Sequence, residues 1–253
     1  MASAARLPPG ASAVDLASAL SSALADRNKA RLLAALEALA GLTSEGKRVQ
    51  CTQRRCGVTV RSALTQYAGD VEVARAGCRA AASLARANDN AVPLVRDGAH
   101  LAVMAAVRAH SGDAEVARAA CATLQCLLST VDNCMPLIRD GVHTVVMAAA
   151  RDHSGDVEVA LATCVVLSQL AGVSGNSAQL VRGGAHAVVM AVLRAHGGDV
   201  EVARAACAAL QNLAGATAYA AMLLRDGVHT AVMAALPRHC DKVEVARAVC
   251  FTL

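Results

Sequence analysis

The chain has 253 residues, of which 55% are hydrophobic, although it contains only two Tyr, one Phe and no Trp. A large globular core usually depends on aromatic bulk, so this composition favours closely packed helices with small contact residues. The 24 basic and 20 acidic residues are scattered along the chain, so we expect no nucleic-acid partner. No apolar stretch reaches the ~18–20 residues of a membrane-spanning helix, so we expect no membrane partner either.

The N-terminal region departs from the pattern of the later chain. Residues 1–14 are rich in Ala and Ser and predict a flexible leader, with an organelle-targeting segment as the alternative. Residues 32–42 resemble the last helix of the later repeats, and residues 57–68 resemble a shortened middle helix, with an insertion expected at 44–53 between them. We therefore interpret residues 15–68 as a degenerate capping repeat.

From residue 69 onward the sequence repeats every 43 residues without an insertion. One column of this repeat holds a glutamate throughout: Glu72, Glu115, Glu158, Glu201 and Glu244. The spacing predicts four repeats, at 69–111, 112–154, 155–197 and 198–240, followed by a truncated repeat at 241–253.

Each repeat carries three helix signals. A short helix is expected between the N-cap residue Asn90 and the terminator Gly98, and a middle helix over 99–109. A third helix starts at the N-cap residue Asp113, and its apolar stripe is expected to be buried. One such repeat cannot bury its apolar faces alone, so the sequence predicts an all-α solenoid of stacked three-helix repeats.

Two motifs carry a family resemblance. The run that begins Gly227-Val-His-Thr-Ala-Val-Met, followed by Val-Glu-Val-Ala-Arg, and the run Leu210-Gln-Asn-Leu-Ala resemble the armadillo repeat. They are most similar in style to armadillo repeat-containing protein six and to the armadillo region of leucine-rich-repeat kinases. The resemblance implies a right-handed armadillo-type α-solenoid whose concave surface binds proteins or peptides.

The resemblance also argues against one known armadillo function. The family's groove asparagines map onto Ser83, Cys126, Gln169 and Asn212, and its groove tryptophans map onto Arg79, Ala122, Val165 and Ala208. Because only one position of the two ladders keeps its residue type, importin-like binding of nuclear localisation signals is not expected.

The histidines and cysteines follow the repeat. All eight histidines fall into two columns, and equivalent residues of stacked repeats are ~10 Å apart, too far to converge on one metal ion. Five of the ten cysteines share one third-helix column and are interpreted as small buried hydrophobes of a reducing compartment. The expected exposed thiols are Cys51, Cys56, Cys134 and Cys240.

No catalytic residue, metal or cofactor is predicted, because a polar residue that recurs in every repeat serves the repeat and no catalytic motif occurs. The third helices supply the expected partner-binding groove, where Glu and Arg at i,i+3 spacing can also simply pair on the surface. The residues assigned to this groove are Glu72, Arg75, Arg79, Glu115, Arg118, Gln125, Glu158, Gln169, Glu201, Arg204, Gln211 and Asn212.

The main prediction is a non-enzymatic scaffold of the cytoplasm or nucleus that binds a protein or peptide. The alternatives are a regulatory armadillo segment of a longer multidomain, kinase-associated protein and, more remotely, a metal or redox protein. The apolar residues near the end of the chain, including Phe251 and Leu253, predict either a C-terminal continuation or end-to-end self-association.

Overall fold

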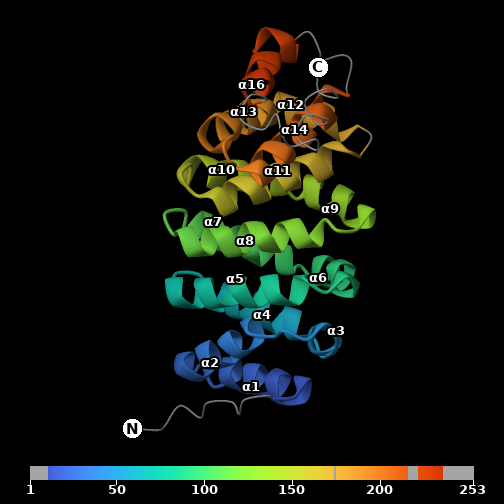
Figure 1. Cartoon of the computed structure of the whole chain (residues 1–253). Coiled ribbons are helices and arrows are strands. Elements are labelled where there is room, and N and C mark those ends of the chain that lie inside the picture. The colour runs from blue at the N-terminus through green and yellow to red at the C-terminus, as the bar shows by residue number, and fades with distance from the viewer. Residues whose placement is uncertain (1–10, 174, 216–221, 236–253) are drawn as a thin grey trace. The chain divides into compact units, whose positions relative to one another are not determined.

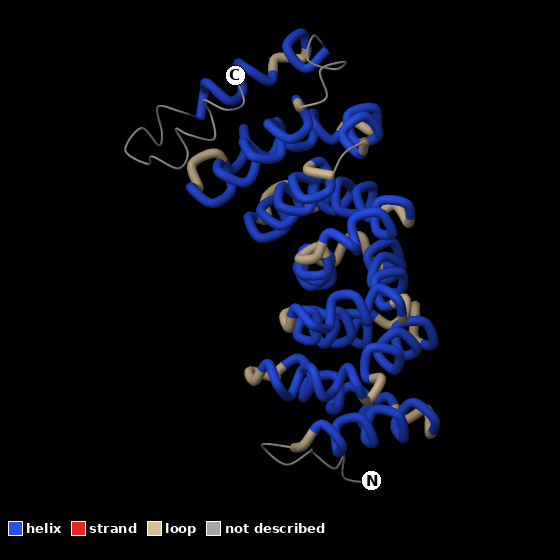
Figure 2. Tube along the Cα trace, turned by 90° about the vertical axis from the view of Figure 1, so that its right-hand side faces the viewer, coloured by secondary structure: helices blue, strands red, loops and turns tan. Residues whose placement is uncertain are grey.

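The computed structural model describes residues 11–173, 175–215 and 222–235. These residues form helices joined by short loops, with no strand among them (Figure 1; Figure 2). The all-α prediction is confirmed. The chain divides into two compact units, residues 1–136 and 137–253, and each is described by itself.

Unit 1 begins with five helices that lead into the regular repeats. These are α1 (Ala13–Ala25), α2 (Lys29–Ala40), α3 (Glu45–Gln53), α4 (Cys56–Gln66) and α5 (Val71–Ala85). They are followed by η1 (Asn88–Asn90), α6 (Ala91–Arg96), α7 (Ala99–Ala109), α8 (Ala114–Leu127) and η2 (Val131–Asn133). The short helix α9 (Cys134–Arg139) spans the boundary between the units.

Unit 2 continues the same order of short, middle and third helices. It contains α10 (Val142–Asp152), α11 (Val157–Ala171), α12 (Asn176–Arg182), α13 (Ala185–His196), α14 (Val200–Ala214) and α16 (Val228–Ala235).

Each unit has two helix layers. In unit 1 the third helices α2, α5 and α8 lie side by side in one layer, and the middle helices α4 and α7 pack together in the other (Figure 1). In unit 2 the third helices α11 and α14 form one layer, while α10, α13 and α16 form the other. The short helices connect the layers, so the third helices of each unit share one face.

The third helices begin and pack as the sequence predicts. The Asp113 carboxylate caps α8 by accepting a hydrogen bond from the Val116 backbone N–H, with an O···N distance of 3.0 Å. The apolar stripe Val116, Ala120, Leu124 and Leu127 is fully buried. At about 25 cal/mol per Å² of apolar surface, burial of this stripe is the main favourable term for the packing of the helix.

A residue with positive φ, in the left-handed backbone conformation, precedes each described middle helix. Its recurrence shows that the 43-residue spacing also holds upstream of residue 69. Gly98 has φ 75°, a conformation that glycine adopts without steric cost. Arg55 stands 43 residues earlier and has φ 62°. The helix α3 (Glu45–Gln53) also precedes the η1–α6 segment (Asn88–Arg96) by 43 residues.

The insertion expected at 44–53 is therefore wrong. Ser44 caps α3 by accepting a hydrogen bond from the Lys47 N–H at 3.5 Å, and the segment folds as the short helix of a repeat. The sequence concealed it because an arginine stands where the later repeats have the terminating glycine.

Several sequence predictions fall wholly or partly beyond these helices. Helix α1 starts at Ala13, so the last two residues of the predicted leader are helical, while residues 1–10 lie outside the described residues. The truncated repeat at 241–253, with Glu244, lies outside them as well. The repeat boundaries and the capping role of 15–68 stay predictions.

Candidate functional site

The solvent-accessible side of the third helices is the candidate site, and we call it the third-helix face. It comprises the accessible side chains of α5 and α8 in unit 1 and of α11 and α14 in unit 2. Its exposed members include Glu72, Arg79, Glu115, Arg118, Glu158, Glu201 and Arg204. Its half-buried members include Arg75, Gln125, Gln169, Gln211 and Asn212. The structure thus places every predicted groove residue at an accessible position.

In unit 1, ion pairs connect each third helix to the next. Lys29 of α2 lies 2.6 Å from both the Asp70 and the Glu72 carboxylates. Arg75 of α5 donates through Nε to the Asp113 carboxylate at 2.9 Å. These cations hold the pKa of the Asp70 and Asp113 carboxyl groups below the usual range. Each N-cap aspartate therefore also receives a cation from the preceding repeat.

The expected pairing of Glu and Arg within one helix is thus wrong for Glu72 and Arg75. Glu72 pairs with a lysine of the preceding third helix, and Arg75 reaches the following one. Arg79 pairs with Glu37 of α2. Arg204 shows the expected i,i+3 contact, with its guanidinium 2.6 Å from the Glu201 carboxylate.

Asn212 has a structural contact within unit 2. Its side-chain amide donates to the Ser168 carbonyl at 3.0 Å and to the Ser168 hydroxyl at 3.1 Å. The Ser177 hydroxyl donates to the backbone carbonyls of Ala171 and Asn212 at 3.0 and 3.1 Å. Asn212 therefore joins α14 to α11, and its side chain is already engaged.

The asparagines predicted as N-caps of the short helices have a different role. The side-chain amides of Asn90, Asn133 and Asn176 are buried and donate to the carbonyls of Leu84, Leu127 and Leu170, at 2.8, 2.6 and 3.0 Å. The last carbonyls of a helix have no partner within the helix, so these amides satisfy the third helices rather than cap the short ones.

Three members of one histidine column, His100, His143 and His186, are buried, whereas the fourth, His229, is exposed. The His186 ring nitrogen Nε2 lies 3.2 Å from the Asp226 carboxylate. His143 is 7% exposed, and Gly183 stands at the position that matches Asp226. Burial lowers the pKa of the His143 imidazole.

The other histidine column joins successive repeats. The Nε2 atoms of His110 and His196 lie 2.9 and 2.7 Å from the carbonyl oxygens of Ala68 and Ser154, each 42 residues earlier. These imidazoles therefore link each repeat to the one before it. The described part of the chain holds no cluster of three or more His, Cys, Asp or Glu with metal-binding geometry.

The cysteines expected as exposed thiols are mostly buried. Cys51 and Cys56 are 0% exposed and hydrogen-bond to each other, and Cys134 is 3% exposed. Cys240 lies outside the described residues. Cys126, on the third-helix face, is half-buried. The burial of Cys51 and Cys56 could not be predicted from their C-x4-C spacing. It depends on the break between α3 and α4, which lies between the two residues.

The shared cysteine column is buried as predicted. Burial raises the pKa of the Cys78 and Cys164 thiols to about 12 and that of Cys207 to about 11. A thiol reacts as its thiolate, so these three side chains are inert packing groups at neutral pH. The last cysteine of the column, Cys250, lies outside the described residues.

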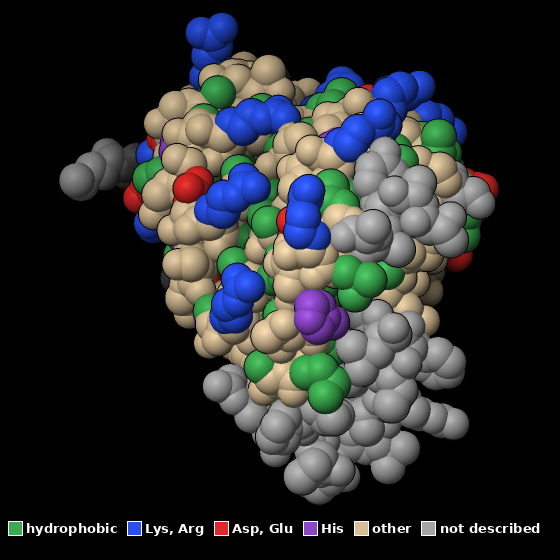
Figure 3. Space-filling view, turned by 90° about the horizontal axis from the view of Figure 1, so that it is seen from above, with side chains coloured by type: hydrophobic (Ala, Val, Ile, Leu, Met, Phe, Trp, Pro, Cys, Tyr) green, Lys and Arg blue, Asp and Glu red, His purple; other side chains and the backbone are tan. Residues whose placement is uncertain are grey.

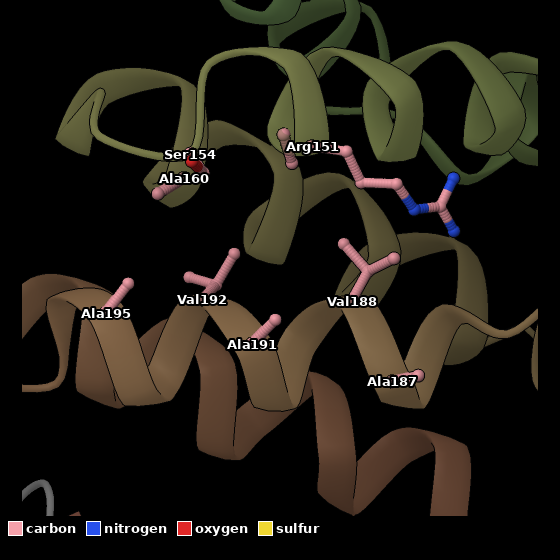
Figure 4. Close-up of a pocket in the computed structure, with 9 residues that line it drawn as sticks. Arg151, Ser154, Ala160, Ala187, Val188, Ala191, Val192 and Ala195 are labelled. Atoms are coloured by element: carbon pink, nitrogen blue, oxygen red, sulfur yellow. The ribbon is translucent and has the colours of Figure 1, made fainter.

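Two clefts lie away from the third-helix face. A cleft of about 350 Å³ separates α10 from α13, where Val188, Ala191 and Val192 form an apolar wall and Arg151 stands at one side (Figure 4). A polar cleft of about 410 Å³ lies between α3 and α6. The face seen in Figure 3 carries lysine and arginine side chains that mostly stand apart, separated by uncharged groups.

The comparison with protein families decides the identity of the repeat. The family model described as the LRRK2 ARM repeat matches residues 43–182, more than half of the chain. The chain belongs to the LRRK2 ARM repeat family. The armadillo resemblance is confirmed, while a specific relation to armadillo repeat-containing protein six is not shown. No curated protein matches this armadillo chain.

Solved structures agree on the fold. Two crystal structures of engineered proteins from the Northeast Structural Genomics Consortium superpose with TM-scores of 0.80. They are 20% and 21% identical to this chain, cover 94% of it, and are themselves covered over 97% and 95% of their length. At this identity the likeness shows the α-solenoid fold alone. No helix of the described residues is long and apolar enough to cross a membrane.

Proposed function

We propose that this armadillo-repeat chain is a non-enzymatic scaffold that binds a peptide or protein segment along the third-helix face. One observation carries the proposal. The buried frame recurs from repeat to repeat, whereas several accessible positions of the third helices change. The position of Arg75 is held by Leu161 two repeats later, and the position of Arg79 by Val165.

Variable residues on a constant frame are the feature that gives a repeat protein a partner-specific surface. The alternative chemistry has less support. The buried cysteines of the third helices carry raised pKa values, and the polar columns are engaged in joining repeats. Armadillo folds also serve as interaction modules in general, which is an argument from fold and not from a site.

Photo-crosslinking in the cells that make the protein tests this proposal. A photoreactive amino acid replaces Val165 on the third-helix face in one variant and Ala191 in the α10–α13 cleft in the matched control. We expect a discrete crosslinked partner from position 165 and none from position 191. Crosslinking from position 191 alone, or from neither position, would overturn the assignment of the binding face.

A second candidate function is a regulatory segment of a longer multidomain protein. The observation that favours it is the match to a family model named for LRRK2. An immunoblot of the native protein, run beside the recombinant chain of 25.6 kDa, distinguishes the two. A much larger native band supports the segment, and co-migration with the recombinant chain rejects it.

A further inference from the structure

A repeated acidic pair opens the third helices, and in unit 1 each described pair holds a cation. The pair consists of the N-cap aspartate and the glutamate two residues later. Arg75 contacts the pair Asp113 and Glu115, with Nε 2.9 and 3.5 Å from the two carboxylates. The pair that opens α5 binds Lys29 in the same way. The fold thus uses this pair as a receptor for a cationic side chain.

At the start of α14 in unit 2, the described residues supply no such cation from the preceding repeat. Helix α14 opens with Asp199 and Glu201, and the position that matches Arg75, twice 43 residues later, is Leu161. Glu201 pairs with Arg204 of its own helix, and in the described part of the chain no cation lies within ion-pair distance of Asp199. The missing arginine leaves Asp199 exposed, whereas the Asp113 side chain is only 13% exposed beneath Arg75.

The geometry of Asp199 is otherwise that of its counterparts. One carboxylate oxygen accepts the backbone N–H groups of Glu201 and Val202 at 2.9 and 3.0 Å. Its position is therefore fixed by the start of α14, and the second oxygen is available. A fixed carboxylate that does not have to reorganise is a better acceptor for an incoming guanidinium than a mobile one.

The surroundings add charge and apolar surface. Glu158 is exposed on α11, one turn before Leu161, and adds a third carboxylate to those of Asp199 and Glu201. Leu161 and Val165 are half-buried on the same side of α11. An arginine side chain matches both parts, because its guanidinium pairs with carboxylates while its methylene groups cover apolar surface.

We propose that the acidic pair Asp199 and Glu201, with Leu161 beside it, binds an arginine side chain supplied by a protein or peptide partner. The partner's guanidinium takes the place that Arg75 fills in unit 1. This inference rests on the proposed scaffold function and names one determinant of its partner. It arises from the interruption of an internal ion pair and does not use the asparagine or tryptophan ladders.

Replacing Leu161 by arginine tests the site, because the protein then supplies its own cation. The probe is a short Gly/Ser/Ala peptide with one central arginine, and the matched control peptide carries citrulline, which has the same shape without the charge. Binding is followed by amide chemical shifts in ¹⁵N NMR spectra at neutral pH and low salt.

We expect the arginine peptide, and not the citrulline peptide, to shift the amide signals of Glu201 and Val202. Leu161→Arg should weaken this binding about threefold to fivefold, in line with the strength of an exposed ion pair, and raise the midpoint of thermal unfolding. Leu161→Met, which keeps the apolar surface, should bind like the unmodified chain. Asp199→Asn should lose the binding while it retains the cap through its side-chain oxygen.

Equal binding of the two peptides, or binding that Leu161→Arg leaves unchanged, would overturn the site. The experiments distinguish a failure of the arginine site from a failure of the proposed scaffold function. A partner that crosslinks at position 165 and is retained by Leu161→Arg contradicts only the arginine site. An arginine peptide that binds here, without any crosslinked partner at position 165, contradicts only the scaffold.

Discussion

The His143 position offers a test in which the structure sets both the sign and the size of the effect. His186 pairs with Asp226, and the residue that matches Asp226 one repeat earlier, in the register of His143, is Gly183. Gly183 has φ −75°, and a Cβ added there would meet its nearest neighbours at 3.4–4.0 Å, one of them the Met147 methyl group. Gly183→Asp should therefore fit without a clash and give His143 a carboxylate partner.

The expected gain depends on pH. In the unmodified chain burial lowers the pKa of folded His143 from 6.5, so its contribution to stability is lost as the pH falls below 6.5. A carboxylate partner favours the protonated imidazole and so raises the folded pKa from this lowered value. The gain of the variant over the unmodified chain is then present at low pH, where His143 is protonated in the folded variant, and is lost as the pH rises through the variant's folded pKa.

The size of the stability gain follows from the pKa change, because two pH-independent terms of Gly183→Asp nearly cancel. Removal of a glycine stabilises by about 0.4–1 kcal/mol at any pH, and a carboxylate at the end of a helix costs a similar amount. These terms nearly cancel, and Arg182 beside the new carboxylate reduces the cost. One unit of pKa change corresponds to about 1.4 kcal/mol, so we expect Gly183→Asp to gain about 1–2 kcal/mol at pH 5.5 relative to pH 9.

Denaturant unfolding followed by circular dichroism at the two pH values measures this difference. Gly183→Asn is the matched control, because it has the same shape and the same loss of backbone freedom without the charge. Its stability relative to the unmodified chain should change little with pH. The reasoning is refuted if Gly183→Asp gives the same change at both pH values, or if the asparagine variant shows an equal pH dependence.

Three further measurements test the roles assigned to other columns. Asn176→Ala should lower the free energy of unfolding by about 0.5–1.5 kcal/mol, because the Leu170 carbonyl loses the Asn176 amide at 3.0 Å and keeps the Val173 N–H at 3.4 Å; an unchanged free energy in denaturant unfolding would contradict that role. Arg55→Gly should raise the free energy of unfolding and Gly98→Ala should lower it by about 1–2 kcal/mol in the same assay, since both residues have positive φ; the same sign for both would contradict the strain argument. Iodoacetamide at pH 8, followed by peptide mass mapping, should modify Cys126 well before Cys164, whose pKa is raised to about 12, and the reverse order would be inconsistent with their burial.

The sequence was sufficient for the repeated part of the fold because its signals are local. An N-cap aspartate, an apolar stripe and a left-handed glycine each act within one helix or turn, so Asp113, Leu124 and Gly98 could be assigned from spacing alone. The helix α3 was missed where one of these signals changed its residue type, at Arg55. The prediction of a short helix relied on the glycine that ends it, as Gly98 does, and no other residue in the sequence marks the same turn.

The contacts between repeats could not be read in the same way. Arg75 has Glu72 at i,i+3 spacing, so a pair within the helix was the visible choice, but the structure gives the arginine to Asp113, 38 residues away. The buried asparagines show the same limit. Spacing gives the residue type at the start of a short helix, and helix packing decides whether Asn176 caps forward or donates back to the preceding helix.

Departures from the repeat therefore have different meanings according to burial. At Gly183 the departure removes a carboxylate beside a buried imidazole, and the effect falls on stability and its pH dependence. At Leu161 it removes a cation from an accessible carboxylate pair, where an exposed ion pair contributes only about 0–1 kcal/mol. Loss of such a pair costs the fold little but opens a charged position to a partner, which is why we place the partner's arginine at Asp199 and not beside His143.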